Sequence, residues 1–99
     1  MKLFIQIPCL NEESTLKRTI HDLPKSIPGI EKIEILIIDD GSTDNTLQVA
    51  EDCGIKHFIK HENTMGLASA FRSGIAYCLK NNADIIVNTD GVINMMVVL

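Results

Sequence analysis

The sequence predicts an α/β domain, a Rossmann-like parallel sheet of about four strands with flanking helices. Short apolar runs alternate with segments of helical periodicity, which is typical of parallel sheets with right-handed crossovers. One run, Ile35 to Ile38, is apolar on both faces, as expected of a central strand that helices cover on two sides. With 99 residues, 45% of them hydrophobic, the chain suffices for one small domain.

Turn and capping residues mark the boundaries of the expected elements. Pro8 closes the first strand, and Asn11 can cap a helix whose first turn carries Glu12 and Glu13, where acids complement the helix dipole. Gly54 ends the second helix. In chain order we expect strand 2–7, helix 12–23, strand 33–39, helix 44–54, strand 55–60, helix 67–80 and strand 83–88. Small residues at near-helical spacing would let the third helix lie close to the sheet: Ala68, Ala70, Gly74 and Ala76.

Two adjacent carboxylates, Asp39 and Asp40, end the central strand. Like charges this close repel each other and must be solvated, hydrogen-bonded or paired with a cation. Open α/β sheets bind ligands at the carboxyl ends of their strands, where the predicted topology gathers several polar segments. These are residues 8–13, 39–44, 63–66 and 88–90. Carboxylates at such an edge suit ribose hydroxyls, base N–H groups and divalent cations.

Each polar segment also has a purely structural explanation when it is taken alone. Asp39 and Asp40 can solvate a strand end while a residue of 42–44 caps the next helix. The turns at 63–66 and 90–91 are of common composition, and His57 and His61 are expected to be solvated loop residues. The functional interpretation depends on the coincidence of these segments at one sheet edge.

Composition and missing motifs exclude several classes of protein. The formal net charge is −4 and only four residues are aromatic, so a nucleic-acid surface is not expected. Three cysteines without metal-like spacing indicate a reducing, cytoplasmic setting and no zinc site. No signal peptide or membrane segment is expected. The first strand is followed by neither a G-x-G-x-x-G nor a Walker A motif, and Lys60-His61 stands where a phospho-receiver domain would carry its acceptor Asp.

Four stretches of the chain resemble the N-terminal half of glycosyltransferase family 2, particularly the branch of polyprenyl-phosphate (dolichyl-phosphate) mannosyl- and glucosyltransferases. They occur in the family's order and spacing over residues 1 to about 91, and together they are specific. The stretches are Ile7-Pro-Cys-Leu-Asn-Glu-Glu13, Ile37-Ile-Asp-Asp-Gly-Ser-Thr-Asp-Asn-Thr46, Asn63-Thr-Met-Gly-Leu-Ala-Ser-Ala70 and Asn88-Thr-Asp-Gly91.

The resemblance implies the N-terminal nucleotide-binding half of a GT-A fold and a UDP- or GDP-linked sugar donor. The positions that would surround the donor base and ribose are Pro8, Leu10, Glu12, Ile37 and Asp39. By this resemblance Asp39 accepts from a base N–H and Glu12 holds ribose hydroxyls, whereas Asp40 is expected to order the turn into the next helix. Asp90 matches the first acid of the D-x-D motif, which in the family handles the donor ribose and a Mg2+ or Mn2+ on the diphosphate.

The chain departs from the family pattern at residue 92. Val92 replaces the second acid of the motif and cannot ligate a cation, which leaves Asp90 as a weak metal ligand. We therefore expect a nucleotide-sugar-binding half-domain over 1–91 and a foreign tail over 92–99. Relatives commonly continue Gly-Asp-Asn-Gln-Tyr-Asp here, and deleting one base from a suitable codon series for that sequence gives Gly-Val-Ile-Asn-Met-Met, as at 91–96. A frameshift is our hypothesis for the tail, and a natural short paralogue is the alternative.

The function expected from the resemblance is hexosyl transfer from a nucleotide-sugar to an acceptor, with a polyprenyl phosphate as the candidate acceptor. The family's catalytic base belongs to its C-terminal half, so this 99-residue chain alone is expected to be inactive. The alternatives are a non-catalytic nucleotide-binding module and a structural or regulatory fragment. Self-association is expected if a sheet edge and helix faces are left uncovered. The expected location is cytoplasmic, with the parent enzyme at the cytoplasmic face of a membrane.

Overall fold

A computed structural model describes residues 1–89 and, in their backbone, residues 93–97. Within these residues no helix is both long and apolar enough to cross a membrane. In chain order the elements are β1 (Lys2–Cys9), α1 (Leu16–His21), β2 (Lys32–Asp39), α2 (Thr46–Asp52), β3 (His57–Lys60), α3 (Leu67–Lys80), β4 (Ile85–Thr89) and β5 (Ile93–Val97).

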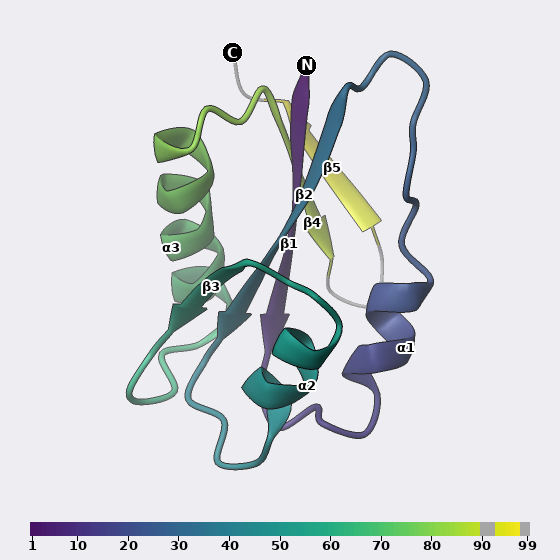
Figure 1. The fold of residues 1–99 in the computed structure, drawn as a ribbon. Helices are drawn as coiled ribbons and strands as arrows, with labels where there is room; N and C mark the ends of the chain where they lie inside the picture. Colours follow the sequence, from purple (N-terminus) through teal and green to yellow (C-terminus); the bar gives the residue numbers. More distant parts are fainter. Residues whose placement is uncertain (90–92, 98–99) are drawn as a thin grey trace.

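The strands form one sheet in the order β3-β2-β1-β4-β5. The strands β1 to β4 run parallel, with each helix in the crossover between two of them. Helices α1 and α2 lie on one face of the sheet and α3 lies on the other (Figure 1). The predicted α/β fold with four parallel strands is thus confirmed. The backbone of β5 adds an antiparallel strand beside β4, within the segment expected to be a foreign tail.

Alternation along the strands divides the apolar core into two layers. Side chains of odd-numbered residues in β1 and β2, such as Ile5 and Ile37, pack with Leu16 of α1 and Ala50 of α2. Even-numbered residues, such as Leu36, pack against α3 instead. Successive side chains of a strand point to opposite faces, so neighbouring residues at the end of β2 also face different layers.

Helix α3 packs closely against the sheet at Gly74. A Cβ atom built there would lie 1.7 Å from Oε1 of Gln6, a fully buried residue of β1. Ala70 is also fully buried, as the predicted close approach requires, whereas Ala68 and Ala76 are exposed. The Gln6 amide donates from Nε2 to Asn88 Oδ1 of β4 at 2.5 Å.

The first strand and first helix differ from the sequence prediction. Strand β1 continues through Pro8 to Cys9, which pairs with Asp39. Proline is tolerated there because the pairing of β1 with β4 ends at Gln6, so no ladder partner is lost on that side. The first helix begins at Leu16, not at residue 12, and residues 12–15 form a turn.

Candidate functional site

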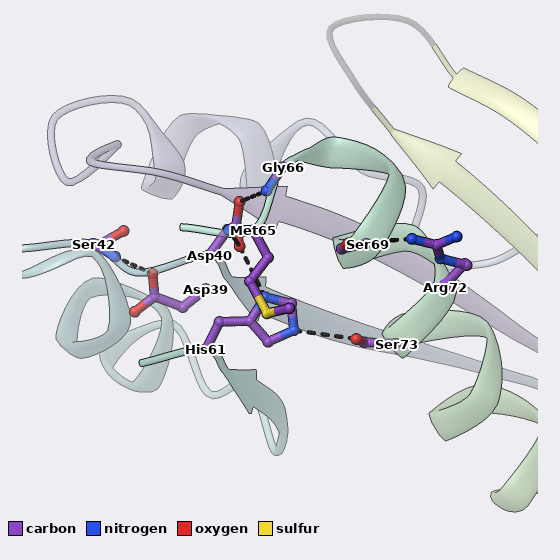
Figure 2. Close-up of polar contacts among 9 residues, drawn as sticks. All are labelled: Asp39, Asp40, Ser42, His61, Met65, Gly66, Ser69, Arg72 and Ser73. Atoms are coloured by element: carbon purple, nitrogen blue, oxygen red, sulfur yellow. Dashed lines mark hydrogen bonds and ion pairs between the residues drawn. The ribbon is translucent and has the colours of Figure 1, made fainter. Parts of the chain in front are cut away.

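The carboxyl ends of β1 and β2 carry the predicted polar edge, and the two acids of β2 serve different loops there. Asp39 is 1% exposed, and its Oδ1 accepts from the Ser42 amide at 2.9 Å. Asp40 is 6% exposed and turns toward the loop after β3 (Figure 2). Asp39 thus orders the turn into α2, the role that the sequence prediction had given to Asp40. That prediction for Asp40 was wrong, because adjacent strand residues face opposite layers.

Asn11 joins the loop after β1 to the loop after β2. Its Oδ1 accepts from the Thr43 amide at 2.8 Å, and its own amide donates to Ser42 Oγ at 2.9 Å. Its φ of 52° lies in the left-handed region, which asparagine tolerates better than most residues. Asn11 therefore does not cap α1 as predicted, because its side chain is held by the neighbouring loop.

A second set of contacts joins the same two loops closer to the helices. The Glu12 amide donates to Thr46 Oγ1 at 2.9 Å, and the Glu13 amide donates to Asp44 Oδ2 at 3.2 Å. Asp44 also accepts from the amide and the hydroxyl of Thr46, and the hydroxyl bond is the main cause that lowers its pKa. Asn45, the residue before helix α2, makes no side-chain cap bond. Of the predicted cap residues, Asp44 accepts from the amide of Thr46, the first residue of the helix, whereas Ser42 and Thr43 serve contacts between the loops.

The buried Cys9 thiol marks the place where Glu12 and Asp39 converge. Burial is the main cause that raises the pKa of Cys9 well above its ordinary range, and the negative charges of Glu12 and Asp39 raise it further. The thiol also hydrogen-bonds with the Glu12 side chain. Two of the carboxylates predicted for donor binding are therefore close enough to act on one buried group.

Asp40 binds the loop between β3 and α3 to the end of β2 through hydrogen bonds. Its Oδ1 lies 2.8 Å from His61 Nδ1 and accepts from the Met65 amide at 2.9 Å, while Oδ2 accepts from the Gly66 amide at 2.9 Å (Figure 2). Burial alone would raise the pKa of this carboxyl, but the hydrogen bonds from His61, Met65 and Gly66 prevail and lower the pKa below its ordinary value. At the adjacent Gly41, whose φ is +88°, a Cβ atom would lie 2.7 Å from the amide nitrogen of Thr64.

His61 continues this network to α3. Its Nε2 lies 3.1 Å from Ser73 Oγ, so Asp40, His61 and Ser73 form an acid–imidazole–hydroxyl chain (Figure 2). Such a chain can activate a serine when free N–H groups nearby stabilise an oxyanion. Ser73 lies in the interior of α3, where backbone N–H groups bond to carbonyls of the preceding turn. The chain is therefore suited to holding the loop in place, not to acyl transfer.

The histidines were the residues that sequence reasoning missed. His61 was expected to be solvated, yet its side chain is 11% exposed and bound on both ring nitrogens. His57 was also expected to be solvated, yet its Nδ1 lies 2.7 Å from the Tyr77 hydroxyl and its Nε2 lies 3.3 Å from Glu34 Oε2. For His61 the available signal was its position, because a polar residue directly after a strand shares the edge with the ends of neighbouring strands.

The remaining predicted site residues occupy different depths. Leu10 is 42% exposed at the rim, Pro8 is half-buried, and Ile37 is fully buried beneath the edge in the core layer of α1 and α2. Asp90 and Val92 lie outside the described residues. The roles of all these residues in binding a donor stay predictions.

The residues described by the structure do not supply a set of metal ligands. Among them, no three His, Cys, Asp or Glu side chains converge as a cation site. Glu12 and Asp39 converge on the Cys9 thiol, whose raised pKa keeps it protonated and so a poor ligand. We therefore derive no step through a metal ion.

In a comparison with known proteins, one family matches nearly the whole chain. The sequence model described as glycosyl transferase family 2 matches residues 4–93. A poly-beta-1,6-N-acetyl-D-glucosamine synthase of Staphylococcus epidermidis is 34% identical, over 85% of this chain and 22% of its own length. A UDP-N-acetylglucosamine–dolichyl-phosphate N-acetylglucosaminyltransferase of Methanococcus voltae is 27% identical, over 89% of this chain and 40% of its own length.

Solved structures agree with the sequence comparison. Glucosyl-3-phosphoglycerate synthase of Mycobacterium tuberculosis, in complex with Mn2+, UDP and glucosyl-3-phosphoglycerate, superposes with a TM-score of 0.71 and 26% identity. The match covers 90% of this chain and 33% of the synthase. The chain thus spans about a third of the length of that enzyme.

Proposed function

This chain belongs to glycosyl transferase family 2, and we propose that it forms the part of such an enzyme that binds the nucleotide-sugar donor. The observation that carries the proposal is that the loops carrying Glu12 and Asp39 meet at the carboxyl edge of a parallel sheet, where Cys9 of β1 pairs with Asp39 of β2 and the Glu12 amide donates to Thr46. Hydrogen bonds join the loop that carries Glu12 to the loop that follows Asp39, so both loops are held in place before a ligand binds. Ligands of open α/β sheets bind at this edge.

We assign the two acids separate roles toward a nucleoside diphosphate. The Oδ1 atom of Asp39 accepts from the Ser42 amide, and we assign the Oδ2 atom to the ligand. That oxygen is suited to accept from the imide N–H of a pyrimidine base. Glu12, which is half-buried in the loop after β1, would hold ribose hydroxyls, with Pro8 and Leu10 against the base. The proposal extends to Asp90 as a further donor contact.

The comparisons favour UDP over GDP as the nucleotide of the proposed donor. UDP stands in the name of the Methanococcus relative and was bound to the Mycobacterium synthase. The name of the Methanococcus enzyme also includes dolichyl phosphate, so a polyprenyl phosphate is our proposed acceptor for the full activity. The three free cysteines suit a reducing compartment, and the proposal includes a cytoplasmic location.

Binding and transfer are separate claims for this chain. The matched part of the chain covers 40% of the length of the Methanococcus relative and 22% of the length of the Staphylococcus relative. The proposed activity of these 99 residues is donor binding, and sugar transfer is proposed only for the complete enzyme.

Isothermal titration calorimetry tests the proposal with UDP, UDP-glucose, UDP-N-acetylglucosamine and GDP, each with and without Mn2+. We expect UDP to bind without the metal, because Val92 stands where the family's D-x-D motif has its second acid and cannot ligate a cation. The Asp39→Asn variant should bind UDP roughly tenfold more weakly, because one charge-assisted hydrogen bond is lost. Glu51→Gln, an exposed change on α2, is the matched control and should bind as the parent does.

The outcomes separate the candidate functions. Binding of UDP that Asp39→Asn weakens and Glu51→Gln does not would support the donor site. Binding that both variants leave unchanged would reject the assignment of Asp39. No binding of any nucleotide would reject the donor function and leave the structural or regulatory fragment.

A further inference from the structure

The strand β2 is longer than its neighbour β3 and has an open edge at its amino end. The pairing of β2 with β3 runs from Leu36–His57 to Asp39–Lys60. The preceding residues, 32–35, pair with β1 on one side and with no described strand on the other. An unpaired strand edge presents N–H and C=O groups that another strand can use.

Alternation of the backbone shows which groups point to the open side. At the far end of β2, the Asp39 carbonyl accepts from His61 on the β3 side, and the Asp40 amide donates to Cys9 of β1. The N–H and C=O groups of one strand residue point to the same side of the strand, and this side alternates from each residue to the next. Odd-numbered residues therefore point away from β1. The N–H and C=O of Ile33 thus face the open side.

A groove runs along this open edge. It encloses about 700 Å³ between β2, the end of α1 and the segment that joins α2 to β3. Its apolar lining includes Ile20, Leu23, Ile33, Ile35 and Ile55. An added strand would therefore meet free peptide groups on one side and apolar side chains on one of its faces.

Three lysines are among the residues that line the groove, although the protein as a whole has a net charge of −4. Lys25, Lys32 and Lys56 line it and are exposed. Glu34 is the one acid in the lining, and it already lies 3.4 Å from Lys32 Nζ and 3.3 Å from His57 Nε2. Two lysines thus remain to attract a negatively charged ligand.

We infer that this groove docks an extended acidic segment of a partner protein, which adds as a strand to the open edge of β2. Backbone hydrogen bonds to Ile33 supply affinity in this mode, and alternate side chains supply specificity. Glutamate or aspartate on the partner would meet Lys25 and Lys56, with apolar residues between them facing Ile35. A second copy of this chain is a poorer occupant, because it would bring its own lysines against these lysines.

This surface is independent of the proposed donor site. The groove lies at the amino ends of the parallel strands, whereas Glu12 and Asp39 lie at the carboxyl ends. Peptide binding and nucleotide binding should therefore not compete.

Fluorescence anisotropy tests the inference with a labelled, capped peptide of alternating valine and glutamate. We expect saturable binding that weakens as NaCl is raised, because the attraction is between charges. The variant Lys25→Glu/Lys56→Glu should bind the peptide at least about tenfold more weakly than the parent does. Lys17→Glu, an exposed change on α1 outside the groove, should bind as the parent does. In an NMR titration the amide signal of Ile33 should shift, while that of Ile5 in the central strand β1 should not.

The controls distinguish strand addition from general attraction. A peptide of the same sequence that is N-methylated at alternate residues cannot complete the backbone ladder in one register and should bind at least several-fold more weakly. Equal binding of the methylated peptide, or unchanged binding by Lys25→Glu/Lys56→Glu, would overturn the inference. Dimerisation through this edge in sedimentation without peptide, abolished in the double variant, would assign the groove to a second copy and also overturn it.

Discussion

Replacing Asp40 by asparagine tests whether this carboxylate holds the loop between β3 and α3. The two oxygens accept three hydrogen bonds, from His61 and Met65 on Oδ1 and from Gly66 on Oδ2. An asparagine amide offers one oxygen and one NH2 group in their place. In either orientation, at least one donor of the loop then faces another donor.

The expected loss follows from these contacts. One charge-assisted hydrogen bond is worth about 1.5–3 kcal/mol, and the bonds that survive become neutral and weaker. The side chain is 8% exposed, so water offers little compensation. We expect Asp40→Asn to lower the free energy of unfolding by about 2–4 kcal/mol, and the melting temperature by at least roughly 8 °C in a domain of this size.

The pH dependence has a definite sign. The folded-state pKa of Asp40 is lowered from the ordinary value of about 3.9. The stabilisation is therefore fully present above about pH 5 and is lost as the pH falls through the folded-state pKa. Asp40→Asn cannot ionise, so the stability difference between parent and variant should narrow below about pH 4.

Urea unfolding followed by far-UV circular dichroism measures both quantities. Glu62→Gln, an exposed change in the same loop, is the control and should shift the free energy by less than about 0.5 kcal/mol. If Asp40→Asn is as stable as this control at neutral pH, the carboxylate does not hold the loop. A stability difference that stays constant from about pH 7 to about pH 3 would also refute the charge-based explanation.

Three further predictions concern backbone packing and the gene. Gly41→Ala should lower the free energy of unfolding by about 3 kcal/mol, because a left-handed backbone is strained by a side chain and the new Cβ would contact the Thr64 backbone. Gly54→Ala, with a similar φ and nothing within 4 Å of the new Cβ, should lower it by only about 1 kcal/mol. Equal losses for the two variants in urea titrations would contradict this. Gly74→Ala should lower the free energy of unfolding by about 2 kcal/mol, because the new methyl group would clash with Gln6. This loss should exceed the gain from the higher helix propensity of alanine. A rise in melting temperature would contradict the prediction. Restoring one base in the codon for residue 92 should let the gene encode Asp-Asn-Gln-Tyr and a transferase remainder, and an unrelated frame would reject the frameshift.

Elements that depend on local pattern could be predicted from the sequence. The helix α3 has the predicted bounds, Leu67–Lys80, because an apolar period, small packing residues and the Asn81-Asn82 pair all agree. The strand β2 begins one residue earlier than predicted, at Lys32. In both cases local propensity and tertiary packing favour the same structure.

Elements that depend on contacts between loops could not be predicted. Asn11, Glu12 and Glu13 have the composition of a helix start, yet the loop after β2 takes their polar groups through Ser42, Thr43, Asp44 and Thr46. The α1 helix is therefore only six residues long. A partner that lies about 30 residues away in sequence leaves no local signal that a capping pattern can detect.

The position of the polar sheet edge was predicted, but the separate hydrogen-bond partners of Asp39 and Asp40 were not. That Asp39 and Asp40 end β2 was predicted, and the polar edge is where the strand pattern put it. The separate partners of the two acids required the geometry of the loop after β3, which sets His61 and two backbone amides around Asp40.

The one-residue separation of Asp39 and Asp40 has a consequence for how this family can diverge. Inserting or deleting a single residue within β2 would rotate both acids to the opposite face of the sheet. The proposed donor contact and the anchor of the loop after β3 would then fail in the same step, and no second substitution nearby could restore one without the other. Length variation among relatives should accordingly be absent from β2 and concentrated in the segment between α1 and β2, where residues 24–31 carry neither role. An alignment of the family can test this expectation without any experiment on the protein.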